Sequence, residues 1–325
     1  MTVGSACGKI ILFGEHAVVY GRPALAVPLV QLRARARVKP RGEGGIVIQA
    51  RNLGRTMRLL DGEVDEALAA ITRLTLQKLG VSGDVNLEIE IESDIPIASG
   101  LGSGAAISTA IVRALTAYFG KLLTADEISA LVYETEKIYH GTPSGIDNTV
   151  IAYEQPIRFV RRGAGSENEI TPFRIARPFT LVIANTGIAS STKITVGDVR
   201  REWERDPARY EKMFDMVGEI VQEAQDALAR GENEALGKLM TRNQRVLEAM
   251  GVSSLEIERL IEAGIRAGAK GGKLSGGGRG GNVIFYVTEE RAEGVRMKLL
   301  DAGAAGVIVT EIRPNNNAST GERPD

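Results

Sequence analysis

Two acidic residues, Glu136 and Asp147, flank a compact segment that contains Gly141, Pro143 and Gly145. Acids joined by such a loop can share one site, where one carboxylate binds a metal ion and the other contacts a hydroxyl group. The same spacing also suits a solvated glutamate on the last turn of a helix and an aspartate that caps a turn. On spacing alone, this second interpretation is favoured.

A lysine, an acid and an imidazole occur together near the start of the chain. Lys9 precedes Glu15 and His16, and the segment between them reads as the end of a strand followed by a turn. Such a lysine could neutralise phosphate charge, while the acid and the imidazole could contact a polar substrate. Lys9 is one of 40 basic residues, and His16 equally suits a satisfied, partly buried histidine, so a structural role is again favoured.

The most informative segment is glycine-rich and runs from a strand into a helix. Glycines let backbone amides approach a ligand, and the first turn of a helix adds N–H groups and the positive end of its dipole. This combination is typical of phosphate binding, although a tight turn without a ligand has the same order of elements. The Walker pattern is absent, and Ala105 stands where the dinucleotide fingerprint has its third glycine. The candidate nucleotide-binding residues are Pro96, Ser99, Gly100, Leu101, Gly102, Ser103, Gly104, Ala105 and Ala106.

A second glycine-rich segment, Lys273–Asn282, lies near the C-terminus. Gly276, Gly278 and Gly281 match the dinucleotide pattern in spacing, but a strand follows them instead of the helix that the fingerprint requires. The alternatives are a flexible loop that closes over a ligand and a β-hairpin-like turn. So many glycines raise the entropic cost of folding, which favours the functional alternative.

Hydrophobic periodicity predicts the elements that position these segments. Strands are expected within Val3–Val38 and at Ile46–Gln49, Val85–Ile91, Thr149–Tyr153, Ile157–Val160, Thr180–Ala184, Val283–Val287 and Gly306–Ile312. Helices are expected at Glu63–Leu79, Ser103–Phe119, Ala125–Tyr139, Ile194–Glu202, Pro207–Arg230, Asn233–Met250, Leu255–Ala267 and Glu289–Ala302. We also expect a hairpin turn at Gly42–Gly45 and a capping box between Thr124 and Glu127.

Strands mixed with packed helices, without regular alternation, predict an α+β protein. The 325 residues suit two domains, which we expect at 1–172 and 173–313, followed by a disordered tail at 314–325. Cys7 is the only cysteine, which excludes an intramolecular disulfide and a cysteine-based zinc site. A net charge of −1 and the lack of a signal sequence or apolar span predict a cytoplasmic protein that binds neither nucleic acid nor membrane.

The order of the motifs resembles the GHMP kinase family, which is named after its galactose, homoserine, mevalonate and phosphomevalonate kinases. The motifs are Lys9 with GEHAVVYG at 14–21, the phosphate-loop segment, GTPSGIDN at 141–148 and KLSGGGRGG at 273–281. The first and third of these resemble the members that act on mevalonate. The implied fold has an N-terminal domain like the second domain of ribosomal protein S5 and a ferredoxin-like C-terminal domain, with the active site between them.

The resemblance implies a role for each matching position. Asp147 would approach the attacking hydroxyl, and Lys9 would lower the pKa of Asp147 and neutralise phosphate charge. Magnesium would be held by Ser103 and Glu136. The implied nucleotide contacts of the C-terminal loop are Gly276, Gly277 and Gly278, and the implied substrate contacts are Glu15, His16, Ser144, Gly145 and Thr192. ATP and mevalonate are the implied substrates, and homodimers are common in the family.

The sequence departs from the family pattern at two positions. Gly104 stands where a second loop serine commonly binds magnesium, so either Ser103 replaces it or Glu136 and water complete the shell. Ser190 stands where an arginine often precedes Ser-Thr, which bears on carboxylate recognition. The alternatives are a family kinase for phosphomevalonate, homoserine or a sugar, a family decarboxylase, and a non-catalytic ATP-binding sensor.

Overall fold

The structure is a computed structural model that describes residues 1–51, 54–59, 66–96, 99–140, 143–163, 166–189 and 191–315. The chain forms two compact units that are interleaved in sequence. The first unit comprises residues 1–9 and 28–154, and the second comprises residues 10–27 and 155–325. The family-domain boundary expected at residue 172 stays a prediction. The mixture of helices and strands confirms the expected α+β class.

The strands of the first unit do not follow chain order. They are β1 (Thr2–Phe13) and β2 (Pro23–Pro40), which continue into the second unit, and β3 (Ile46–Ala50), β4 (Arg55–Arg58) and β5 (Leu87–Ser93). Residues 34–40 of β2 pair antiparallel with β5, which pairs parallel with β3, and β3 pairs antiparallel with β4. The hairpin expected at Gly42–Gly45 is therefore wrong, because β5 lies between β2 and β3. Parallel strands need a crossover connection, and the chain between β3 and β5 supplies it.

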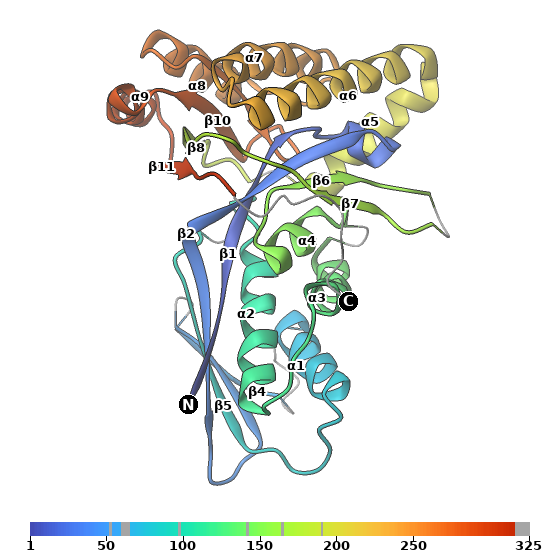
Figure 1. Cartoon of the computed structure of the whole chain (residues 1–325), viewed down its shortest axis with the longest axis vertical. Coiled ribbons are helices and arrows are strands. Elements are labelled where there is room, and N and C mark those ends of the chain that lie inside the picture. The colour runs from blue at the N-terminus through green and yellow to red at the C-terminus, as the bar shows by residue number, and fades with distance from the viewer. Residues whose placement is uncertain are drawn as a thin grey trace. The chain divides into compact units, whose positions relative to one another are not determined.

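Four helices complete the first unit: α1 (Glu66–Lys78), α2 (Ser103–Tyr118), α3 (Ala125–His140) and α4 (Ile146–Tyr153). Helix α2 contacts β5 and the other three helices, and it runs beside the strands in Figure 1. The capping box is confirmed, because the Thr124 N–H donates to Glu127 (3.0 Å) and the Glu127 N–H donates to the Thr124 hydroxyl (3.2 Å).

The strand expected at Thr149–Tyr153 is wrong, because these residues belong to α4. Its β-branched residues favour a strand, but they are buried against α2 and α3, and tertiary packing overrides this weak preference. The Asn148 side chain donates to the Ser129 hydroxyl (2.8 Å) and so ties α4 to α3. This change of element places Asp147 in the first turn of a helix.

The second unit contains two strand groups. Residues Pro23–Ala26 of β2 pair with β6 (Ile157–Val160), which pairs with β7 (Glu169–Pro172). A separate antiparallel sheet has the order β11-β8-β10-β9, with β8 at Phe179–Asn185, β9 at Gly271–Ser275, β10 at Asn282–Val287 and β11 at Gly306–Ile312. Every residue of β10 is buried, so this strand forms the centre of the core.

The helices of the second unit are η1 (Ala17–Tyr20), α5 (Thr192–Arg205), α6 (Pro207–Arg230), α7 (Glu234–Ala249), α8 (Leu255–Arg266) and α9 (Glu289–Asp301). Helices α7, α8 and α9 contact the four-stranded sheet, and α6 runs beside α7 (Figure 1).

Strands β4, β7 and β9 were not predicted from the sequence. Because β9 pairs with β10, the second glycine-rich segment is a β-hairpin turn in its backbone.

Two further expectations concern the chain as a whole. Asn315 is hydrogen-bonded to the Ile175 N–H (2.8 Å) and the Phe173 carbonyl (2.9 Å), so the start of the expected disordered tail is ordered. The remainder of that tail, residues 316–325, lies outside the described residues. Within the described part of the chain, no helix is long and apolar enough to cross a membrane.

Candidate active site

An ion pair between Lys9 and Asp147 forms the centre of the candidate site in the first unit. The Lys9 ammonium lies 3.0 Å from a carboxylate oxygen of Asp147, and the two side chains are 5% and 28% exposed. Lys9 lies on β1, where its N–H donates to the Leu101 carbonyl (2.9 Å). The lysine is therefore fixed in the core, while the aspartate remains accessible to a ligand.

The backbone around Asp147 favours a carboxylate at this point. Gly145 has φ 92° and is the N-cap of α4, and the Ser144 hydroxyl accepts a bond from the Ile146 N–H (3.3 Å). A negative charge in the first turn interacts favourably with the helix dipole. Gly145 and Ser144 thus shape the turn that presents Asp147, and the expectation that this aspartate only caps a turn is wrong.

Glu136 is a buried acid close to the same pair. It lies on α3 and only 3% of the residue is exposed, so the interpretation as a solvated helix residue is wrong. Burial and, to a smaller extent, the Asp147 charge raise the pKa of Glu136 to about 8, and Lys9 opposes both effects. One lysine supplies too little positive charge for both acids to ionise, and a bound cation would favour the ionised form of Glu136.

The phosphate-loop segment lies against this group. Gly102 has φ 77° and is the N-cap of α2, and no side-chain cap bond occurs there among the described residues. A Cβ at Gly102 would lie 2.7 Å from Ile151 and 3.0 Å from Lys9, so the backbone approaches the lysine as closely as only glycine allows. Ser103 begins α2 and is half-buried.

The other residues of the segment support this geometry. The Ser99 hydroxyl donates to the Pro96 carbonyl (2.7 Å), and Gly100 has φ 74°. Ile97 and Ala98, which complete the segment, lie outside the described residues. The residues that anchor the start of α2 in the core are Leu101, Ala105 and Ala106, whereas Gly104 is half-buried.

The second unit holds a different ionic group. Lys273 on β9 forms an ion pair with Glu15, and the side chains are 0% and 1% exposed. Lys273 also donates to the Leu274 carbonyl (2.6 Å). Burial lowers the pKa of Lys273, and Glu15 counteracts this effect. No role was predicted for Lys273 from the sequence. The one feature that could have indicated a role is a lysine within a segment that forms a strand.

His16 links Glu15 to the β9–β10 turn. Its Nε2 lies 3.0 Å from the Gly277 carbonyl, and burial lowers the pKa of the imidazole to about 4. The ring is therefore neutral near pH 7 and donates through Nε2. Its Nδ1 is buried and has no hydrogen-bond partner among the described residues. The expectation of a fully satisfied histidine is wrong at this atom.

Thr192, at the start of α5, lies on the other side of Gly277. A Cβ at Gly277 would be 2.9 Å from the Thr192 hydroxyl, and a Cβ at Gly278 would be 2.1 Å from the Val252 carbonyl. Gly276 has φ 97°. The turn therefore needs glycine for close approach at 277 and 278. Ser190, the second departure from the family pattern, lies outside the described residues.

The candidate residues thus form two groups, one within each unit. Lys9, Glu136 and Asp147 meet beside the phosphate-loop segment in the first unit, and Glu15, His16, Thr192 and the glycine turn meet in the second. Within the described residues, no group of three or more His, Cys, Asp or Glu side chains could hold a metal ion by itself. The first group combines a cation, two acids and a helix N-terminus, which suits an anion bound together with a divalent cation.

Comparisons with known proteins agree with this chemistry. The model of the GHMP kinases N terminal domain matches residues 66–155, and that of the GHMP kinases C terminal domain matches residues 224–305. Mevalonate kinase of Thermococcus onnurineus is 34% identical, covering 94% of this chain and 95% of its own length. That of Aeropyrum pernix is 36% identical, covering 89% of both. A crystal structure of L. major mevalonate kinase in complex with R-mevalonate superposes with a TM-score of 0.84 at 28% identity, covering 97% of this chain and 96% of that one.

Proposed function

This chain belongs to the GHMP kinase family, and from this premise we propose that it is an ATP-dependent kinase that phosphorylates the 5-hydroxyl of (R)-mevalonate. The observation that carries the chemistry is the Lys9–Asp147 pair at 3.0 Å beside the glycine-rich start of α2. The substrate follows from the curated archaeal relatives, which align along almost the whole chain.

Phosphoryl transfer needs little covalent chemistry from the protein. It needs the alcohol oxygen in line with the γ-phosphorus and positive charge around the phosphate oxygens. We assign the orientation of the hydroxyl, and acceptance of its proton, to Asp147, whose carboxylate is the exposed member of the pair. Lys9 holds this carboxylate in place and adds positive charge, and the backbone amides at the start of α2 contact the phosphates.

The residues present fit a magnesium ion. Glu136 is a buried carboxyl group beside a second acid, and Ser103 is half-buried at the start of α2. Magnesium keeps several waters and binds through one or two protein oxygens plus phosphates, so Gly104 in place of a second serine is compatible with the site. When bound, the ion supplies charge neutralisation on the phosphates. Ser103 and Glu136 would hold it.

The second unit supplies the remaining proposed contacts. Glu15, His16 and Thr192 of this unit are assigned to the acceptor, and the contacts of Ser144 and Gly145 with the acceptor stay a prediction. The neutral imidazole of His16 has an acceptor nitrogen, Nδ1, that suits a hydroxyl donor. Gly276, Gly277 and Gly278 are assigned to the nucleotide phosphates. A cytoplasmic location and a homodimer stay predictions.

A coupled assay of ADP release tests the proposal. The purified chain is incubated with MgATP and, separately, mevalonate, 5-phosphomevalonate, homoserine and galactose, and the product masses are recorded. We expect turnover on mevalonate with a product heavier by one phosphate. Turnover on another acceptor only would retain the kinase and change the substrate, and loss of a carboxyl group would indicate a decarboxylase. ATP binding without turnover would favour the sensor alternative.

A further inference from the structure

The turn between β9 and β10 contains an arginine in a conformation that favours glycine. Arg279 has φ 54°, a left-handed value that non-glycine residues adopt only when their surroundings hold them there. It is flanked by Gly278 and Gly280, which have φ values of 77° and 140°. The strain at Arg279 must therefore be offset by contacts of this residue.

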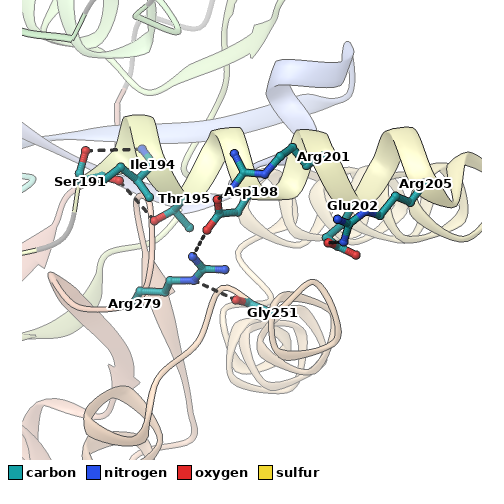
Figure 2. Close-up of polar contacts among 9 residues, drawn as sticks. All are labelled: Ser191, Ile194, Thr195, Asp198, Arg201, Glu202, Arg205, Gly251 and Arg279. Atoms are coloured by element: carbon teal, nitrogen blue, oxygen red, sulfur yellow. Dashed lines mark hydrogen bonds and ion pairs between the residues drawn. The ribbon is translucent and has the colours of Figure 1, made fainter.

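Three contacts hold Arg279. Its N–H donates to the Val252 carbonyl (2.8 Å), and its Nε donates to the Gly251 carbonyl (3.2 Å). Its guanidinium also forms an ion pair with Asp198 on α5, as Figure 2 shows. The side chain thus links the turn to the residues after α7 and to α5.

Asp198 is positioned by its own helix. Ser191 caps α5 by accepting a bond from the Ile194 N–H (3.5 Å), and Thr195 is buried one turn further on (Figure 2). Arg201 also pairs with Asp198, and the Arg279 bond contributes most to lowering the pKa of this carboxyl group. Asp198 is therefore an anion shared by two arginines, and it holds the guanidinium of Arg279 on α5.

The rest of the turn is also bonded. The Gly277 carbonyl accepts from His16, the Gly281 N–H donates to the Ile188 carbonyl (3.1 Å), and the Thr186 N–H donates to the Gly281 carbonyl (2.8 Å). A turn held at these points is rigid, in contrast to the flexible loop expected from its glycine content. Among the described residues, the ion pair between Arg279 and Asp198 is the one that joins the turn to α5. Helix α5 begins at Thr192, which lies against Gly277.

We propose that the Arg279–Asp198 pair is a positioning pair that locks the glycine turn onto α5 and thereby sets the affinity for the acceptor alcohol. This inference rests on the proposed function, because the two groups that the turn separates, His16 and Thr192, are assigned to the acceptor. Arg279 acts through the backbone of the turn, because its side chain is already bonded to the Gly251 carbonyl and to Asp198. Displacement of Gly277 would move both of its neighbours.

The test compares Arg279→Ala and Asp198→Asn with Arg205→Ala as a matched control. Arg205 pairs with Glu202 on the same helix, and among the described residues it forms no hydrogen bond or ion pair with the turn (Figure 2). Since the lost interaction is made equally in the ground and transition states, we expect the KM for mevalonate to rise about three- to tenfold in both test variants, with kcat within about twofold of wild type. The control should match wild type.

Hydrogen exchange of the peptide that covers residues 276–281, measured without substrates, separates this inference from the proposed function. We expect faster exchange in Arg279→Ala and Asp198→Asn, and wild-type exchange in Arg205→Ala. If wild type turns over none of the acceptors, the proposed function fails, and the exchange result alone decides whether the pair locks the turn.

Two outcomes would overturn the inference. Unchanged exchange in both test variants would show that the pair does not hold the turn. A KM change in Arg279→Ala without one in Asp198→Asn would show that the arginine charge contacts a ligand directly. Arg279→Gly extends the test, because it relieves the backbone strain while removing the ion pair. A KM raised as in Arg279→Ala would assign the effect to the side chain.

Discussion

Each of the two units contains an ion pair between an acid and a lysine on a strand, but the two pairs differ in their access to solvent. In the first unit, Lys9 is 5% exposed and Asp147 is 28% exposed. In the second unit, Lys273 and Glu15 are 0% and 1% exposed. Asp147 is accessible, so a ligand could replace Lys9 as its partner. Solvent does not reach Lys273 or Glu15, so neither side chain would find a new partner in water if it lost the other.

The two pairs also differ in the charged groups that surround them. Glu136 lies beside the first pair, and the charge of Asp147 contributes to its raised pKa. The second pair is balanced, and the nearby His16 is neutral because burial lowers its pKa to about 4. We infer that the first cluster is arranged to receive a cation and an anion, and that the buried Lys273–Glu15 pair fixes the position of the residues beside it.

Removal of the buried lysine should have the largest effect on stability. Lys273→Met leaves Glu15 buried without its cation, which costs about 3–5 kcal/mol of unfolding free energy. Urea denaturation measures the loss. The matched control is Lys298→Met, which removes an exposed pair with Asp301 and should change stability by less than about 1 kcal/mol. Equal effects of the two substitutions would remove the distinction between the pairs.

Substitution of the accessible acid should impair activity and spare the fold. Asp147→Asn removes the carboxylate to which we assign orientation of the hydroxyl and acceptance of its proton, and kcat should fall about 10²- to 10³-fold, equivalent to about 3–4 kcal/mol. ATP affinity, measured by calorimetry, should change little, and the melting temperature should stay close to that of wild type. Near-complete activity in this variant would exclude Asp147 from the reaction.

The close approach of backbone to Lys9 gives a third prediction. Gly102→Ala introduces a Cβ 2.7 Å from Ile151 at φ 77° and should destabilise the protein by about 2–3 kcal/mol, through strain and overpacking together. Gly276→Ala is the control, because its φ is also positive but no atom lies within 4 Å of the added Cβ. It should therefore show the backbone strain alone, so denaturation curves of equal midpoint would contradict the steric argument.

Because His16 is buried, we expect the stability of the protein to depend on pH. Its folded pKa of about 4 is lower than its ordinary value of 6.5, so between these limits the unfolded chain binds more protons than the native state. Stability therefore rises as the pH increases from 4 to 6.5, and the part due to His16 between pH 5 and 7 is about 2 kcal/mol. His16→Asn should flatten this slope in urea titrations. An unchanged slope would mean that the imidazole is protonated in the native state.

The sequence predicted the helices well where their apolar periodicity was long, as in α2 and α6. It also named the candidate residues of the first unit through the family resemblance, and their roles stay predictions. It failed where packing overrode local preference. The β-branched residues of α4 favoured a strand, and the glycines at 42–45 suggested a hairpin that β5 interrupts. It also gave no sign that Glu136 is buried, because helix spacing does not reveal what packs against a face.

The second cluster was harder to predict because its contacts are long-range. Lys273 meets an acid 258 positions earlier in the chain, and no local pattern encodes that pairing. From the sequence, Arg279 could be recognised only as an arginine among glycines. Its left-handed backbone and its partner Asp198 follow from the hairpin geometry of β9 and β10, and β9 itself was not predicted because Gly271 and Gly272 disfavour strands.

The interleaving of the two units has a consequence for synthesis of the chain. Residues 10–27 are made early but belong to the second unit, whose last core strands are made near the end. The partners of Glu15 and His16 are Lys273 and Gly277, which are synthesised 258 and 261 positions later. The second unit therefore cannot complete these contacts until its C-terminal part has left the ribosome. The first unit, whose residues end at 154, can still form before the second, as is usual for tandem domains. The high-separation contacts of the second unit also favour its slow closure.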